Sequence, residues 1–180
     1  YAGLGGASFV YFIWRHNLAD LAARAIAPAG AVFAFVCLAT GALWGRPMWG
    51  AWWVWDARLT SMLVLFLLYL GYMALRAAIE DEKLSARAGA ILAMAGLINL
   101  PIIKFSVDWW NTLHQPASVF RFDGPTIDPS QLWPLAIMAL AFTVLYLALI
   151  LTQMRAMLME RRADALERRR ERRLELEAEL

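Results

Sequence analysis

The sequence predicts an all-α membrane protein, a polytopic bundle of transmembrane helices, and three observations support this fold class. Apolar residues make up 61% of the 180 residues. The mean hydropathy is +0.52, and both values exceed those expected of a soluble domain of this size. Five apolar runs alternate with polar connections. Four of these runs are long enough to cross ~30 Å of hydrocarbon at ~1.5 Å per residue of helix.

The apolar runs define the expected spans in order along the chain. The first run, residues 2–14, would reach only about 20 Å as a helix, and it begins at Tyr1 without a flanking polar residue. We therefore expect it to belong to a span that starts upstream. The four complete spans are expected at residues 25–44, 59–75, 88–107 and 133–154. Five spans are thus visible in a transmembrane domain over residues 1–154, and no signal peptide pattern precedes them.

The basic residues in the connections predict the orientation of the spans. If the connections alternate between the two sides, thirteen Lys and Arg side chains fall on one side and four on the other. The four are Arg46, Arg58, Lys104 and Arg121. Because cytoplasmic connections carry the excess of Lys and Arg, we expect segments 46–58 and 105–132 to lie outside. The connections at residues 15–24 and 76–87 are then cytoplasmic.

The C-terminal segment, residues 155–180, contains eight arginines and seven acids that are interleaved. This pattern is typical of a solvated helix, and we expect a cytoplasmic helix that continues from the last span. A nucleic-acid partner is disfavoured because the acids nearly cancel the basic charge.

Several kinds of chemistry lack the residues that they require. Cys37 is the only cysteine and lies inside an expected span, so an internal disulfide or a Cys-x-x-Cys motif is excluded. No phosphate-binding Gly-rich loop, nucleophile elbow or His-Glu-x-x-His zinc motif is present. The sequence therefore indicates no catalytic residues.

The outer segment 46–58 is rich in tryptophan. Four of the nine tryptophans fall within seven positions, followed by an acid and a base: Trp49, Trp52, Trp53, Trp55, Asp56 and Arg58. Pro47 suits the first turn of a helix, and a helix over 47–58 would put Trp49, Trp52, Trp53 and Asp56 on one face. Two interpretations stay open. The tryptophans form either an aromatic belt at the headgroup level or a platform for a flat apolar ligand, with Arg58 or Arg46 meeting its carboxylates.

His114 is a candidate metal ligand in the other outer segment. It follows the end of a span and would share a helical face with Trp110 if that helix continued. A neutral imidazole near an aromatic surface suits axial ligation of haem iron, although an ordinary polar loop residue is the alternative. His16 is expected across the membrane, in a solvated cytoplasmic connection. Asn99 and Pro101 predict that the span at residues 88–107 is kinked and polar at this point. Either the helix packs near a site there, or the two residues only serve local helix packing.

The motifs resemble those of one family. The run Trp49–Ser61 (WGAWWVWDARLTS) is similar to the tryptophan-rich signature of haem-handling membrane proteins, and specifically of cytochrome c maturation protein C, also called haem exporter protein C. Related haem lyase and synthase families generally have Pro after the aspartate, where this chain has Ala57. Three further runs are similar to the same family: residues 27–33, 99–103 and 109–115. The likeness covers about residues 18–115.

The resemblance implies a fold and a site. In the family, six helices cross the bacterial inner membrane, and haem, taken here as haem b, is held on the periplasmic side by the Trp-rich segment and by a histidine in each flanking loop. His114 matches the second histidine and is the implied iron ligand, whereas the first is expected upstream of Tyr1. The implied haem-binding residues are Trp49, Trp52, Trp53, Trp55, Asp56, Arg58, Trp110 and His114.

The resemblance also implies partners and a role. The implied role is to present haem to a periplasmic haem chaperone during c-type cytochrome biogenesis, in a complex with ABC transporter subunits and a small single-span subunit. A permease or haem exporter subunit with the Trp cluster as an outer gate is an alternative, and it predicts ionisable residues at mid-membrane depth. Few are visible, with Lys104 and Asp108 near a helix end. A structural subunit that recruits the transporter is a third hypothesis.

Overall fold

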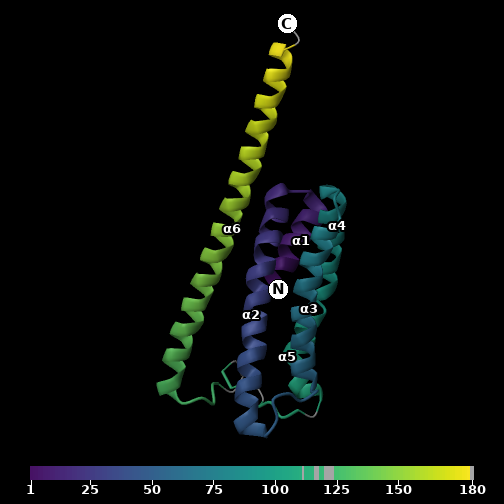
Figure 1. The fold of residues 1–180 in the computed structure, drawn as a ribbon. Helices are drawn as coiled ribbons and strands as arrows, with labels where there is room; N and C mark the ends of the chain where they lie inside the picture. The colour runs from purple at the N-terminus through teal and green to yellow at the C-terminus, as the bar shows by residue number, and fades with distance from the viewer. Residues whose placement is uncertain (111, 116–117, 120–123, 179–180) are drawn as a thin grey trace.

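The computed structural model describes residues 1–110, 112–115, 118–119 and 124–178. This part of the chain is helical and contains no strand. The helices are α1 (Ala2–Trp14), α2 (Asn17–Trp49), α3 (Ala57–Ala78), α4 (Glu82–Gly96), α5 (Asn99–Trp109) and α6 (Pro129–Ala178). Figure 1 shows α1 to α5 gathered in a bundle, with α6 beside α2 and projecting beyond the bundle.

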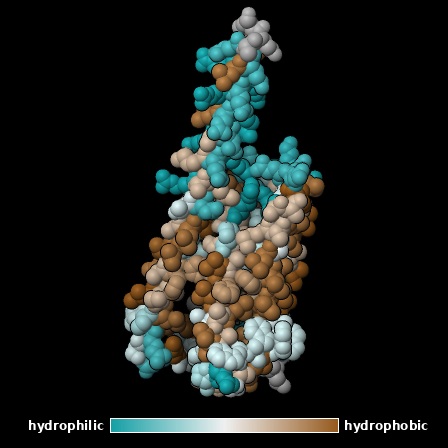
Figure 2. Space-filling view, in the orientation of Figure 1, coloured by the Kyte–Doolittle hydropathy of each residue, from teal (hydrophilic) through white to brown (hydrophobic). Residues whose placement is uncertain are grey.

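The helices confirm the predicted polytopic membrane protein. Four helical stretches are long and apolar enough to cross a membrane: Asn17–Trp49, Ala57–Ala78, Glu82–Trp109 and Pro129–Glu177. Each contains one of the four complete spans that the sequence predicts, and α1 is the shorter apolar helix. Figure 2 shows an apolar band across the middle of the molecule, with hydrophilic residues at the projecting end of α6. Exposed apolar side chains in this band suit contact with lipid.

Small residues allow the helices of the bundle to approach closely. Ala23, Ala27 and Ala31 of α2 are buried in the core, and a side chain at Gly30 would collide with the ring of Tyr69 on α3. Close backbone packing of this kind is typical of helices in membranes. At the other end of the same pair, buried Arg76 of α3 donates to both carboxylate oxygens of Asp20, at 2.6 and 3.1 Å.

The span that contains Asn99 and Pro101 is interrupted for two residues, where the sequence predicts a kink. Helix α4 ends at Gly96 and α5 begins at Asn99. The buried Asn99 side chain donates from Nδ2 to the backbone oxygen of Ser61 on α3, at 2.8 Å. Of the two roles that the sequence left open for this pair, local helix packing is the one with a contact in the structure.

The helix predicted over residues 47–58 is wrong. Helix α2 continues through Pro47 to Trp49 and ends at Gly50, whose φ of 75° is left-handed. The next helix begins only at Ala57, because the Asp56 carboxylate caps it by accepting from the backbone N–H of Leu59 at 2.7 Å. Two strong helix-end signals, a C-terminal glycine and an N-cap aspartate, thus outweigh the helical spacing of the tryptophans. Trp49, Trp52, Trp53 and Asp56 therefore do not share a helix face.

The continuation of α5 to His114 is also wrong. The helix ends at Trp109, and Trp110 is already extended with φ −130° and ψ 152°. Trp110 and His114 therefore do not lie on one helical face. Residue 111 falls outside the described residues.

The described residues of the two predicted outer segments meet at one end of the bundle. The α2–α3 connection and the segment after α5 meet there, whereas the α1–α2 and α3–α4 connections lie at the opposite end (Figure 1). His16 is the exposed N-cap of α2 at that opposite end. Helix α6 continues without a break through the predicted charged segment to Ala178. Its Arg161 pairs at 2.5 Å with Glu82 of α4, which lies 3.7 Å from Arg24.

Candidate functional site

His114 is held by an aspartate that lies 58 residues earlier in the sequence. The imidazole Nδ1 lies 2.7 Å from Oδ2 of Asp56. The Asp56 side chain is only 5% exposed and the His114 side chain 19% exposed. Because Asp56 is fixed as the N-cap of α3, it positions an imidazole that belongs to an irregular segment.

Thr112 completes this arrangement. Its hydroxyl donates to Oδ2 of Asp56 and accepts the backbone N–H of His114 at 3.1 Å. The same hydroxyl oxygen lies 3.2 Å from Nδ1 of His114. Thr112 thus links the backbone of the His114 segment to the carboxylate that orients the imidazole.

The charge of Asp56 follows from these contacts. Burial of the side chain raises the pKa of its carboxyl, but hydrogen bonds from Thr112, the Leu59 backbone and His114 outweigh burial, so the pKa lies below its usual value. An ionised carboxylate only accepts hydrogen bonds, so Nδ1 of the imidazole is the donor. In a neutral imidazole the lone pair is then on Nε2, which is the nitrogen left free for a metal.

Two tryptophans at the end of α2 lie beside the imidazole. The ring centroids of Trp49 and His114 are 4.8 Å apart, with an angle of 69° between the planes. Trp44 packs edge-on against Trp49, with centroids 5.2 Å apart and an angle of 83°. Helix α2 therefore supplies an aromatic wall next to the histidine.

A cavity of about 560 Å³ opens next to this wall. It is lined by residues of α2, α3, α5, α6 and the segment between the last two helices: Trp44, Trp49, Arg58, Lys104, His114, Gln115, Ser118, Val119, Ile127 and Leu135. Aromatic and aliphatic groups, two cations and one imidazole meet in it. Its volume is within the ~300–1,000 Å³ of small-molecule and cofactor sites.

A comparison with known proteins identifies the family. The family model described as Heme exporter protein C matches residues 1–169. The chain belongs to the Heme exporter protein C family.

Relatives in bacteria and a plant support this assignment. Heme exporter protein C of Bradyrhizobium diazoefficiens is 62% identical over 149 residues, which cover 83% of this chain and 57% of that protein. Heme exporter protein C of Escherichia coli strain K12 is 49% identical over 159 residues, which cover 88% of this chain and 64% of that protein. The Putative cytochrome c biosynthesis ccmC-like mitochondrial protein of Marchantia polymorpha is 45% identical over 142 residues, which cover 79% of this chain and 59% of that protein. The chain thus spans less than two thirds of the length of these relatives.

The structure brings together only some of the residues that the resemblance to the Heme exporter protein C family implies. Trp49, Arg58 and His114 line the cavity, and Asp56 lies directly behind His114. Trp52 and Trp55 are outside its lining and are 56% and 75% exposed.

The remaining two implied tryptophans also lie outside the cavity lining. Trp53 packs edge-on against Trp55, with centroids 5.4 Å apart, and its buried Nε1 has no hydrogen-bond partner. Trp110 is exposed and packs against Trp109, with centroids 6.2 Å apart. Neither Trp53 nor Trp110 lines the pocket beside His114.

The sequence interpretation missed several residues of the site. Trp44 was counted only as the end of a span, although the helix that carries it continues to Trp49. Thr112 precedes His114 by two residues, a spacing at which a hydroxyl commonly bonds to the backbone. Lys104 was considered in the count of basic residues and in connection with a permease, but not as a residue of the site. Its position in the cavity depends on how α5 packs on α3, which no local pattern reveals.

Among the residues that the structure describes, His114 is the one metal-ligating side chain that lines this cavity. Within the described ranges, no group of three or more His, Cys, Asp and Glu side chains could hold a metal ion. Cys37 lies in α2, within the expected span, and is exposed on the surface of the bundle. One oriented imidazole beside aromatic rings fits a metal whose other ligands come from a macrocycle, as in haem.

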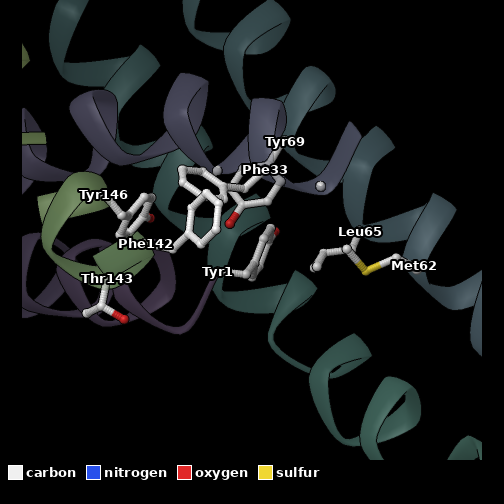
Figure 3. Close-up of a pocket in the computed structure, with 10 residues that line it drawn as sticks. Tyr1, Phe33, Met62, Leu65, Tyr69, Phe142, Thr143 and Tyr146 are labelled. Carbon is white, nitrogen blue, oxygen red and sulfur yellow. The ribbon is translucent and has the colours of Figure 1, made fainter. Parts of the chain in front are cut away.

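A second cavity in the bundle has different chemistry. It measures about 370 Å³ and lies between α2, α3 and α6, with Tyr1 at one side. Figure 3 shows the rings of Phe33, Tyr69, Phe142 and Tyr146 around it. It is lined by apolar and hydroxyl-bearing residues and has neither an imidazole nor a cation. The cavity beside His114 is therefore the better candidate for the site of the family.

Proposed function

We propose that this chain binds haem in the cavity beside His114 and delivers it on the periplasmic side during c-type cytochrome biogenesis. The hydrogen bond between Asp56 and His114 carries the proposal, because it leaves Nε2 of the imidazole free beside an aromatic cavity. The printed names of the relatives, heme exporter proteins and a cytochrome c biosynthesis protein, support the same role.

Each wall of the site has a proposed part in binding. Nε2 of His114 coordinates the iron, and the ring of Trp49 lies against the flat ligand. Arg58 meets a carboxylate of haem. Trp52, Trp53, Trp55 and Trp110 extend the haem-binding surface outside the cavity. The exposed rings of Trp52, Trp55 and Trp110 also suit the membrane interface.

The setting of this activity is proposed from the family resemblance. The chain would lie in the bacterial inner membrane and hold haem b for transfer to a periplasmic haem chaperone. ABC transporter subunits and a small single-span subunit would form the complex with it, surrounded by membrane lipids. This division of labour agrees with a sequence that contains no phosphate-binding loop of its own.

The experiment that tests the proposal is an absorption spectrum of the purified full-length protein with haem. His114→Ala should shift the haem spectrum or empty the site, because no neighbouring imidazole can replace the lost coordination bond. Added imidazole should partly restore the spectrum. His16→Ala is the matched control, since His16 lies at the opposite end of the bundle, and it should leave the spectrum unchanged. An unchanged spectrum for His114→Ala at normal haem content would contradict the proposal.

A further inference from the structure

Two cations, Arg58 and Lys104, line the candidate cavity. Arg58 lies in the first turn of α3 and Lys104 in the middle of α5, and these two helices pack against each other. Neither side chain forms an ion pair or a hydrogen bond with any residue that the structure describes. The cavity therefore contains two positive charges that no described acid neutralises.

Three acids that the structure describes in the neighbouring elements do not pair with Arg58 or Lys104. Asp108 lies one helical turn after Lys104 but forms no ion pair with it. Asp56 is buried and already accepts from Leu59, Thr112 and His114. Asp128 accepts from Ser130 at the start of α6. Cations beside apolar surface are stabilised by an anion in contact with them. Because no acid among the described residues supplies that anion, a bound ligand is the source of negative charge that we consider.

The other walls of the cavity are mainly apolar. Trp44 and Trp49 come from α2, and Val119, Ile127 and Leu135 come from α6 and the segment before it. A ligand that fits must therefore combine a broad apolar face with anionic groups along one edge. A tetrapyrrole with two carboxylates has this distribution, and its central metal would face the imidazole.

We propose that Lys104 acts together with Arg58 to bind the two carboxylates of this ligand. Lys104 is then a specificity-determining residue that selects a dicarboxylate tetrapyrrole and fixes its carboxylate edge toward α3 and α5. This inference rests on the proposed function. To the proposed haem site it adds Lys104 as a binding residue and an orientation of the ligand.

The test compares haem with its dimethyl ester, in which both carboxylates are neutral. Binding of each is titrated to the full-length protein in nanodiscs of zwitterionic lipid, for the unaltered protein and for Lys104→Gln. Because a charge-assisted hydrogen bond contributes ~1.5–3 kcal/mol, Lys104→Gln should weaken haem binding about tenfold or more. It should not change the affinity of the dimethyl ester, and Lys104→Arg should restore haem binding.

The chain offers a matched control for the lost charge. Its only other lysine, Lys83, is exposed in the first turn of α4 at the opposite end of the bundle. Lys83→Gln should leave the affinities of both ligands unchanged.

Three outcomes would overturn the inference. Equal weakening of haem and its ester by Lys104→Gln would mean that Lys104 only supports the fold. No change with either ligand would mean that Lys104 does not meet a carboxylate. In a parallel titration with an anionic phospholipid, loss of phospholipid binding in Lys104→Gln, with haem binding intact, would assign the charge to a lipid headgroup.

The proposed function has a separate readout in the same experiment. The His114-dependent haem spectrum should persist in Lys104→Gln at saturating haem. If the unaltered protein shows no such spectrum, the proposed function fails and this inference fails with it.

Discussion

Asp56 has two structural roles at once. Its carboxylate begins α3 as an N-cap and also orients the imidazole of His114. Because the cap belongs to the helix, the imidazole is held by a rigid element although its own segment is irregular. This explains how a histidine outside any helix can have a defined orientation.

Replacing Asp56 should separate these two roles. Asp56→Asn retains helix capping, since Asn and Asp are about equally good N-caps, but it removes the charge that accepts from Nδ1 of His114. Haem affinity should fall about 10–100-fold, as is typical when the partner of a metal-bound histidine is lost. Helical content by circular dichroism should stay unchanged. An affinity equal to that of the unaltered protein would show that Asp56 does not position the ligand.

The lowered pKa of Asp56 gives this prediction a pH dependence. A carboxyl whose pKa is lower in the folded protein stabilises it fully above the unfolded value of ~3.9, and this contribution is lost as pH falls through the lower folded value. The free energy of unfolding should therefore decrease below about pH 4 through this group. In Asp56→Asn, titrated in parallel, that part of the decrease should be absent.

Much of the site at the residue scale could be predicted from the sequence. Trp49, Arg58 and His114 were each expected, and they share a cavity. The contact of Asp56 with His114 was not expected, because it joins residues that are 58 positions apart in the sequence and lie near two helix ends. The sequence pattern indicates which residues have suitable chemistry, but their contacts depend on where the helices stop.

At the scale of elements, the ends of helices are where prediction and structure differ. The four complete spans were predicted because backbone groups in hydrocarbon must be hydrogen-bonded within a helix. The segment from Gly50 to Asp56 was predicted as helix from the spacing of its tryptophans, yet it connects two helices. Spacing over three turns is weak support when a glycine and an aspartate at its ends favour termination.

This connection provides a test of the two interpretations of the tryptophans. If they extend the haem surface, Trp52→Ala combined with Trp53→Ala should abolish transfer of haem to the chaperone while the protein still inserts. Chaperone loading and the amount of inserted protein are measured together. Trp133→Ala is the control, since Trp133 is a 73% exposed tryptophan at the start of α6. Loss of inserted protein in proportion to loss of transfer would favour an aromatic belt.

At the scale of the whole molecule, the bilayer decides most of what the sequence can predict. Alternating spans force segments 46–58 and 105–132 to one end, and the structure brings Asp56 and His114 into contact there. The lateral arrangement is less predictable. Helix α6 packs mainly on α2, and its charged extension contacts α4 through Arg161 and Glu82. Within the spans, such pairings depend on side-chain fit between surfaces that are all apolar.

The compartment that the site faces is a prediction about the whole molecule. The excess of Lys and Arg, thirteen against four, predicts that the end with His114 is outside the cytoplasm. In a Cys37→Ser background, Thr126→Cys should react with a membrane-impermeant maleimide in intact cells. Glu80→Cys should react only after the membrane is permeabilised. Both positions are exposed, one in the segment before α6 and the other in the α3–α4 connection.

The labelling pattern also decides where haem can be transferred. Thr126 donates its backbone N–H to the oxygen of Ser118, which lines the cavity beside His114. A labelled Thr126→Cys would therefore put the site within reach of a periplasmic chaperone. The reverse pattern, with Glu80→Cys labelled in intact cells, would overturn the orientation. It would leave the geometry of the site intact but direct it toward the cytoplasm. Periplasmic delivery would then be excluded even if His114 binds haem.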